Sequence, residues 1–290
     1  MNGLLNVAKA AGMSSHDVVN VVRRLAHTRR VGHTGTLDPL ATGVLVLLVG
    51  PATRLARFFS GAVKSYRAVA RLGETTTTYD AEGEVVERCP VTVTRGEVVA
   101  VLEELRGDQL QIPPMYSAVK VRGEILYKLA RQGKEVERPP RPVTVYDVAL
   151  LDWSPPELTF EVTVSAGTYV RTLAHDLGQR LGCGAHLRSL TRLAAGQFRL
   201  EQSYTLDELR VLADAGRLEE ALLPAAEALE LPAVRLTEAQ VQAVRHGQQI
   251  TLEDAPTAPE IQAQEPGGRF VAVLIPLGEG VWRPNLVLNL

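Results

Sequence analysis

The stretch GHTGTLDPLATG, residues 32–43, contains four glycines or prolines and a single acidic residue, Asp38. It leads directly into residues 44–49, an aliphatic run bounded by glycines, which is typical of a fully buried strand. Pro39 biases the backbone of the residue before it toward an extended conformation. We therefore expect a rigid turn that holds a carboxylate at the mouth of a buried strand, where it could act as a nucleophile or as an acid or base. The alternative is that Asp38 is an ordinary turn or capping residue.

On both sides of this turn, helical and extended patterns follow one another in an irregular order, without repeated strand-helix-strand units. Such irregular interleaving favours an α+β domain with a mixed sheet over a doubly wound fold. Helix-capping patterns and apolar periodicity predict the elements. Helices are expected at residues 14–26, 94–105, 170–181 and 205–230, the last interrupted at Pro224, and further strands at residues 65–72, 143–150 and 158–164.

The C-terminal part of the chain has a different pattern. Pro232 favours a boundary near residue 230, so we predict one domain at residues 1–230 and a compact β-rich module at residues 231–290. The stretch 254–268 is rich in Pro, Gly, Ala, Glu and Gln and is expected to form an exposed loop. The module's predicted elements are a capped helix at residues 237–245 and strands near residues 249–252, 270–275 and 285–288.

The composition is that of a globular protein, with 46% hydrophobic and 22% charged residues among 290. Its longest aliphatic run is far too short to cross a membrane, and two cysteines cannot form a disulfide framework, so the cytoplasm is the expected compartment. Cys183 and His186 form a single C-x-x-H pair, which is not a zinc-ligand set. The net charge of −2 carries no sign of nucleic-acid binding, although four arginines at positions 23, 24, 29 and 30 could form either a solvated helix face or a phosphate-binding surface.

Taken together, five motifs in this chain resemble those of the TruB family of pseudouridine synthases. The stretch around Asp38 resembles the catalytic motif of that family. The others follow in the same order, at residues 64–67 (KSYR), 113–120 (PPMYSAVK), 165–172 (SAGTYVRT) and 182–196 (GCGAHLRSLTRLAAG). The resemblance implies the pseudouridine synthase fold, a mixed and largely antiparallel central sheet flanked by helices. Residues 232–290 resemble, more loosely, the small PUA-like RNA-binding domain of these enzymes.

The resemblance also implies catalytic roles for three residues. Asp38 matches the catalytic aspartate, and Arg171 matches the arginine that pairs with it, since a nearby guanidinium keeps a buried carboxylate ionised. Tyr66 matches the tyrosine that stacks on the target base. Its unperturbed pKa near 10 makes it a poor general base, so proton removal would need a neighbour or water. Substrate-binding roles are implied for His33, which would fill the space left by extruded nucleotides, for Tyr169 and Leu190, which would line the uracil pocket, and for Lys9, which would support the site or contact phosphate.

The implied reaction converts uridine 55 in the T-loop of tRNA to pseudouridine. It involves base flipping and needs no cofactor or metal. The implied partner is the T-arm and elbow of tRNA, bound by a monomer without guide RNA. Two positions depart from the family pattern. The first motif reads Ala8-Lys9-Ala10 where Asp-Lys-Pro is usual, and Thr77 stands where an aspartate is common.

Two other functions remain open on the sequence. A non-catalytic RNA-binding module with this fold would be expected to lack Asp38, Tyr66 or Arg171, and all three are present. A carboxylate-dependent hydrolase would need a second carboxylate beside Asp38, and the motif itself offers none.

Overall fold

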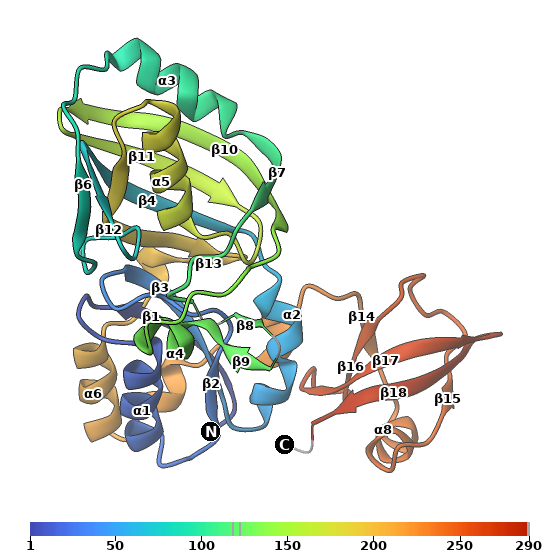
Figure 1. The fold of residues 1–290 in the computed structure, drawn as a ribbon. Coiled ribbons are helices and arrows are strands. Elements are labelled where there is room, and N and C mark those ends of the chain that lie inside the picture. The colour runs from blue at the N-terminus through green and yellow to red at the C-terminus, as the bar shows by residue number, and fades with distance from the viewer. Residues whose placement is uncertain (118, 122, 289–290) are drawn as a thin grey trace.

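The computed structural model describes residues 1–117, 119–121 and 123–288. Ala118, within the expected proline-rich motif, therefore lies outside the described residues. Figure 1 shows a large body that contains the longest sheet and a smaller β-rich unit beside it, joined by the segment before β14 (Ala233–Arg235). No helix among the described residues has the length and apolar character needed to span a membrane.

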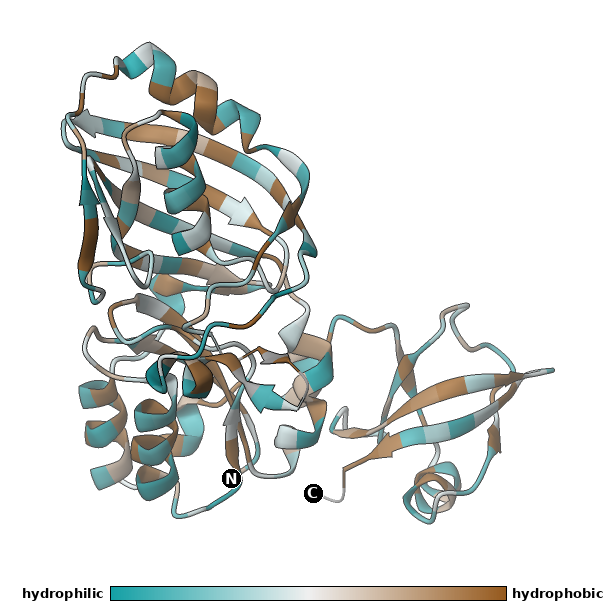
Figure 2. Cartoon of the chain, in the orientation of Figure 1, coloured by the Kyte–Doolittle hydropathy of each residue, from teal (hydrophilic) through white to brown (hydrophobic). Residues whose placement is uncertain are grey.

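A nine-stranded sheet forms the centre of the large body, with the order β1-β3-β12-β4-β11-β10-β7; β2 also pairs with β3, and β13 with β12. Alternating apolar and polar side chains mark one buried face along β4, as the sequence predicts (Figure 2). The strands are β1 (Gly3–Lys9), β2 (Val31–His33), β3 (Thr42–Val49), β4 (Lys64–Leu72), β7 (Gly107–Gln111), β10 (Arg141–Ser154), β11 (Glu157–Val164), β12 (Ala185–Ala195) and β13 (Phe198–Arg199).

The pairing between β3 and β12 is the short junction of this sheet. These strands pair in parallel only at Thr42 with Thr191 and Gly43 with Arg192, whereas the other described pairs in this sheet are antiparallel. Gly43 has a φ of +99°, and a Cβ atom there would lie 2.2 Å from the Arg192 carbonyl oxygen. Only glycine allows this approach. The expected mixed, largely antiparallel sheet is confirmed, and its narrow junction lies next to the loop that carries Asp38.

Helices pack on the sheet through the apolar faces that the sequence predicts. Serine or threonine N-caps with reciprocal capping boxes begin α1, α3 and α6, as expected from their S/T-x-x-D/E patterns. In Figure 1, α3 and α5 lie over β10, β11 and β4, and α1 and α6 lie side by side below β1. The helices of the body are α1 (Ser15–Leu25), α2 (Ala56–Ser60), α3 (Arg95–Glu104), α4 (Leu126–Arg131), α5 (Val170–Arg180), α6 (Leu206–Asp214) and α7 (Ala225–Ala228), with 3₁₀ turns η1 (Gly50–Leu55), η2 (Leu200–Gln202) and η3 (Leu218–Ala221).

Two small hairpins lie outside the main sheet, β5 (Glu74–Thr76) with β6 (Val85–Arg88), and β8 (Lys120–Val121) with β9 (Glu124–Ile125). The turn between β5 and β6, residues 77–84, returns to β12: the Leu187 N–H donates to the Tyr79 carbonyl at 2.9 Å, and the Ala81 N–H to the Leu187 carbonyl at 2.9 Å. This short turn is therefore fixed to the centre of the main sheet.

The C-terminal unit is a five-stranded sheet in the order β14-β16-β17-β18-β15 with one helix, α8 (Glu238–Arg245). Apolar residues of β17 and β18 also pack against β3, α2 and α7 of the body in a shared core that includes Phe270, Leu286 and Leu288. The unit is therefore joined to the body by buried apolar contacts as well as by the chain. Its strands are β14 (Ala233–Arg235), β15 (Ile250–Thr251), β16 (Ile261–Gln264), β17 (Phe270–Gly278) and β18 (Val281–Val287).

Two element predictions are wrong in detail. Residues 205–230 are not one interrupted helix, because Gly216 takes a φ of 70° after α6 and only short turns follow it. The expected loop at residues 254–268 contains the buried strand β16, in which Ile261 and Ala263 join the core of the unit. Its polar Gln262 is also buried, because its amide donates to the Leu229 and Leu231 carbonyls at 3.1 and 3.0 Å. Because Gln262 makes these hydrogen bonds inside the protein, a polar residue can occupy a buried strand position, and the sequence here suggests a loop instead.

Candidate active site

A pocket of about 260 Å³ opens at the junction between β3 and β12. Its wall comes from the β2–β3 loop, from β4 and β12, and from the turn that begins α5. These segments are far apart in the sequence and meet only through the sheet. Five residues with predicted site roles line this pocket, namely Asp38, Tyr66, Tyr169, Arg171 and Leu190.

Arg171 lies in the first turn of α5, and its side chain is 5% exposed. Its Nη2 donates to Asp38 Oδ1 at 3.2 Å and to the Tyr116 carbonyl at 2.6 Å. Its Nη1 donates to Asp80 Oδ2 at 3.2 Å. A guanidinium stays charged when buried and has several donors in one plane, so it can hold two carboxylates in fixed directions. The predicted pairing of Asp38 with Arg171 is present in the geometry.

Asp38 differs from its partner in exposure, because 32% of its side chain remains accessible, on the wall of the pocket. Removal from bulk water raises the pKa of this carboxyl above its usual range. The Arg171 charge opposes that shift, and the negative charge of Asp80 adds to it. Arg171 supplies the one hydrogen bond to this carboxylate among the described residues, so its other lone pairs are free to accept from a ligand.

The loop that carries Asp38 is held through its backbone. Ser15 Oγ donates to the Leu37 carbonyl at 3.0 Å and accepts from the Leu37 N–H at 2.8 Å. Lys9, which is 1% exposed, donates through Nζ to the carbonyls of Ala10, Met13 and Pro39 at 3.0, 2.6 and 3.2 Å. Burial lowers the pKa of Lys9 to about 8. All three ammonium donors are directed at carbonyls, so Lys9 supports the loop, which is one of the two roles expected for it.

Arg192 on β12 is a residue that sequence reasoning did not single out. It is 2% exposed, and its guanidinium donates to the carbonyls of Val44, Thr36 and Gly35 at 2.6, 3.4 and 3.0 Å. It thereby fixes both ends of the loop that carries Asp38. Position 192 lies within the motif at residues 182–196, but nothing in its local spacing distinguishes it from Arg188, which is exposed.

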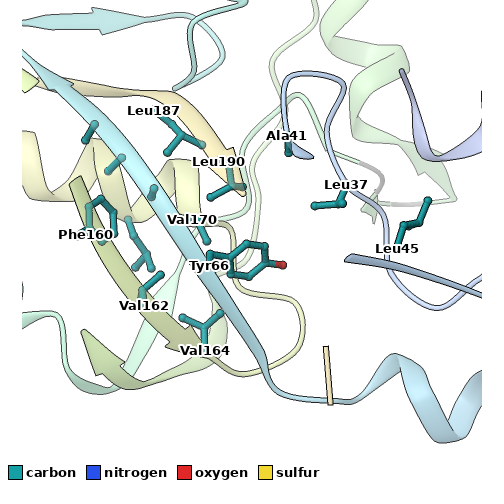
Figure 3. Packing of buried hydrophobic residues seen from close by; sticks show 14 of the residues in the cluster. Leu37, Ala41, Leu45, Tyr66, Phe160, Val162, Val164, Val170, Leu187 and Leu190 are labelled. Atoms are coloured by element: carbon teal, nitrogen blue, oxygen red, sulfur yellow. The ribbon is translucent and has the colours of Figure 1, made fainter. Parts of the chain in front are cut away.

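Tyr66 extends from β4 across the pocket toward the β2–β3 loop (Figure 3). The figure also shows Leu37, Val170 and Leu190 around it. Tyr66 is 6% exposed, and Leu190 is 7% exposed. Tyr169 is the N-cap residue of α5, and its backbone N–H donates to Gln111 Oε1 at 2.7 Å. The pocket therefore combines one carboxylate and the cationic side chains of Lys64, Arg171 and Arg192 with an apolar and aromatic surface that suits the flat face of a pyrimidine.

Asp80 is a second residue that the sequence predictions missed. Its side chain is 3% exposed, and besides Arg171 it accepts from Thr78 Oγ1 at 2.5 Å and from the Glu82 N–H at 3.1 Å. The motif at residues 32–43 offers no second carboxylate, as the sequence indicates, but the fold brings Asp80 from another segment to the same guanidinium. Asp80 is not part of the pocket wall, so it is not placed to protonate a leaving group there. This arrangement does not favour the hydrolase alternative.

His33 is not on the pocket wall. It ends β2, two residues before Gly35, and burial lowers the pKa of its imidazole. Its Nδ1 is buried without a hydrogen-bond partner among the described residues. Across residues 1–117, 119–121 and 123–288, no three His, Cys, Asp or Glu side chains form a group that could hold a metal ion.

Two known protein families together match most of this chain. Residues 23–170 match the TruB family pseudouridylate synthase N-terminal domain, and residues 171–230 match the tRNA pseudouridylate synthase B C-terminal domain. The chain is 45% identical over 292 residues to the tRNA pseudouridine synthase B of a Dehalococcoides mccartyi strain, covering 99% of this chain and 96% of that protein. It is 46% identical over 277 residues to the same-named protein of Stutzerimonas stutzeri, covering 94% and 91%.

Solved structures show the same fold. A chain of a Cbf5-Nop10-Gar1 complex superposes with a TM-score of 0.71 at 27% identity, covering 96% of this chain and 79% of that one. A chain of an H/ACA ribonucleoprotein bound to a substrate RNA superposes with a TM-score of 0.75 at 24% identity, covering 99% and 85%. The fold and the family matches define a pseudouridine synthase, an isomerase of RNA uridine. Within that class the chain belongs to the TruB family.

Proposed function

We propose that this enzyme converts uridine 55 in the T-loop of tRNA to pseudouridine, with Asp38 as the essential catalytic group. The observation that carries the proposal is the Asp38 carboxylate, held by Arg171 at 3.2 Å and open to a pocket with an aromatic wall. The reaction breaks the N-glycosidic bond, turns the base and joins it through carbon 5, releasing the hydrogen of that carbon. It is redox-neutral, so a positioned carboxylate is the chemical requirement.

Pocket geometry supports the roles of Tyr66, Tyr169 and Leu190. A uridine inside a folded loop must leave its stack to reach Asp38, so the reaction requires base flipping. Tyr66 stacks on the flipped base, and Tyr169 and Leu190 bound the space that receives it. His33, close in the chain to Gly35 but outside the pocket wall, fills the space left in the T-loop.

The relatives that are named tRNA pseudouridine synthase B support tRNA as the substrate. We propose that the T-arm and elbow of tRNA bind to a cytoplasmic monomer without guide RNA or any cofactor. RNA loops are recognised through backbone path and unstacked bases, so loop shape should set specificity. The C-terminal unit, residues 231–290, would add affinity for tRNA as a PUA-like domain, since none of its described residues lines the pocket.

Release of tritium from tRNA transcribed with carbon-5-labelled uridine tests this proposal. The purified full chain, in EDTA and without other RNA, should release one equivalent from unmodified tRNA and from a T-arm hairpin, and none from a hairpin with a scrambled loop. Mass spectrometry should place the product at position 55. No release from either tRNA or hairpin would refute the proposed activity, and release at many uridines would refute the T-loop specificity.

A further inference from the structure

Beside the contact between Asp80 and Arg171 lies an aromatic stack that the proposed chemistry does not use. The rings of Tyr79 and His175 are stacked with centroids 3.9 Å apart and planes inclined by 14°. Tyr79 precedes Asp80 in the chain, and His175 follows Arg171 by one helical turn of α5. Side chains four residues apart lie on the same face of a helix. The turn at residues 77–84 therefore touches α5 at two adjacent points, one aromatic and one ionic.

The backbone of Tyr79 has a conformation that favours glycine. Its φ is 64°, in the left-handed region that L residues other than Gly, Asn and Asp rarely adopt. The conformation brings its N–H to the Thr76 carbonyl at 3.2 Å and its carbonyl to the Leu187 N–H at 2.9 Å. Glycine would form the same turn without strain. A tyrosine here makes a contact with α5 that glycine could not make.

His175 is suited to the stack as a neutral ring. It is half-buried, and burial lowers the pKa of its imidazole. Its Nδ1 is buried and finds no hydrogen-bond partner in the described part of the chain. A neutral ring places no second positive charge beside Arg171, so Asp80 keeps Arg171 as its ionic partner.

We propose that the stack of Tyr79 on His175 is a positioning device that holds Asp80 against Arg171 and thereby directs the guanidinium toward Asp38. Both residues act through others and do not touch substrate. Asp80 and Asp38 bind different terminal nitrogens of one planar group, so a shift of the Asp80 turn rotates the donor that reaches Asp38. The activity readout rests on the proposed function, whereas the stack is a feature of the folded protein alone.

Tyr79→Gly is the decisive variant, because it removes the ring and suits the positive φ. We expect it to keep the melting temperature and the tRNA Kd of the wild type while kcat falls by about tenfold, since displacement of a positioning group acts on the chemical step. Tyr79→Phe, which keeps the stacked ring, should retain kcat within about twofold, because stacking depends on the ring face. His175→Phe should behave like Tyr79→Phe, and His175→Ala like Tyr79→Gly.

An Asp80→Ala background, which removes the contact with Arg171, shows whether the ring acts through Asp80. If it does, adding Tyr79→Gly to Asp80→Ala lowers kcat no further, whereas independent effects multiply. Wild-type kcat in Tyr79→Gly, or full multiplication in the double variant, would overturn the positioning role. If Tyr79→Gly loses stability and tRNA binding together with kcat, the stack is structural and the proposal fails as well. Wild-type protein run in parallel separates these outcomes from failure of the T-loop reaction itself, which would remove turnover from every sample.

Discussion

The two loops that meet at Arg171 hold their carboxylates in opposite ways. The β2–β3 loop presents Asp38 with one hydrogen bond among the described residues and 32% of the side chain accessible. The turn at residues 77–84 presents Asp80 with three hydrogen-bond donors and 3% accessible. Both carboxylates lie 3.2 Å from the same guanidinium. Equal distance to a cation therefore does not mean equal function, because only the carboxylate with free lone pairs can react with a substrate.

Their anchoring explains this difference. The Asp38 loop is fixed by Ser15, Lys9 and Arg192, all of which bind its backbone and leave its carboxylate open. The Asp80 turn instead uses the carboxylate itself as an anchor, through Thr78 and the Glu82 N–H. Substitution at these two positions should therefore separate chemistry from positioning.

Asp38→Asn should have the largest effect. The change removes the charge but little volume, so turnover should fall by more than about a hundredfold, or about 2.7 kcal/mol of activation free energy. The tRNA Kd should change little, because affinity for RNA comes mainly from many backbone contacts. Tritium release and filter binding on the same preparation measure the two quantities. A variant that keeps more than about a hundredth of the wild-type rate would move the catalytic role away from Asp38.

Asp80→Asn should have a smaller effect on the rate and a larger one on stability. An amide oxygen can still accept from Arg171, so we expect kcat to fall by about 10-fold to 100-fold, as when a positioning group is weakened. Its burial means that imperfect hydrogen bonding should lower the free energy of unfolding by about 1–3 kcal/mol. Urea denaturation and kcat measurements test the two parts.

Asp147→Asn provides a matched control for Asp80→Asn, because Asp147 also binds an arginine, Arg106, but at the surface with 66% of its side chain exposed. Such an exposed ion pair contributes little, so this variant should match the wild type in both measurements. An Asp80→Asn variant that also matches the wild type would erase the distinction between the two loops.

The loop that presents Asp38 could be predicted from the sequence, whereas the contact of Asp80 with Arg171 could not. The glycines and proline of residues 32–43, the capping box that begins α1 and the alternation along β4 are local patterns, and the structure confirms them. Strand β12 was missed because bulges near Leu187 and Arg192 break its alternation. Asp80 and Arg192 owe their roles to contacts with residues 91 and 148 positions away, which local spacing does not encode.

The pH dependence of activity provides a third test. Burial raises the pKa of Asp38, so kcat/KM should fall on the acid side at a pH above the usual range of an aspartate. The negative charge of Asp80 contributes to this rise. Removing it in Asp80→Asn lowers the pKa of Asp38, and the acid limb should move to lower pH even though the plateau is reduced. An acid limb that moves to higher pH would show that Asp80 acts on Asp38 mainly by orienting Arg171.

Within the turn at residues 77–84, Glu82→Gln should have a much smaller effect than Asp80→Asn, and it separates position from charge. Glu82 belongs to the same turn as Asp80, and burial together with the charges of Asp80 and Asp38 raises the pKa of its carboxyl. The side chain of Glu82 is nevertheless exposed, and it makes no ion pair within the described residues. Glu82 contacts Asp80 through its backbone N–H, which the substitution keeps. Solvent screens an exposed charge, so kcat should stay within about twofold of the wild type and the acid limb should not move.

Initial rates of tritium release between pH 5 and 8 measure both, on Glu82→Gln and Asp80→Asn in parallel. A Glu82→Gln variant whose acid limb moves as far as that of Asp80→Asn would mean that the summed negative charge of the turn, rather than the bond from Asp80 to Arg171, sets the ionisation of Asp38.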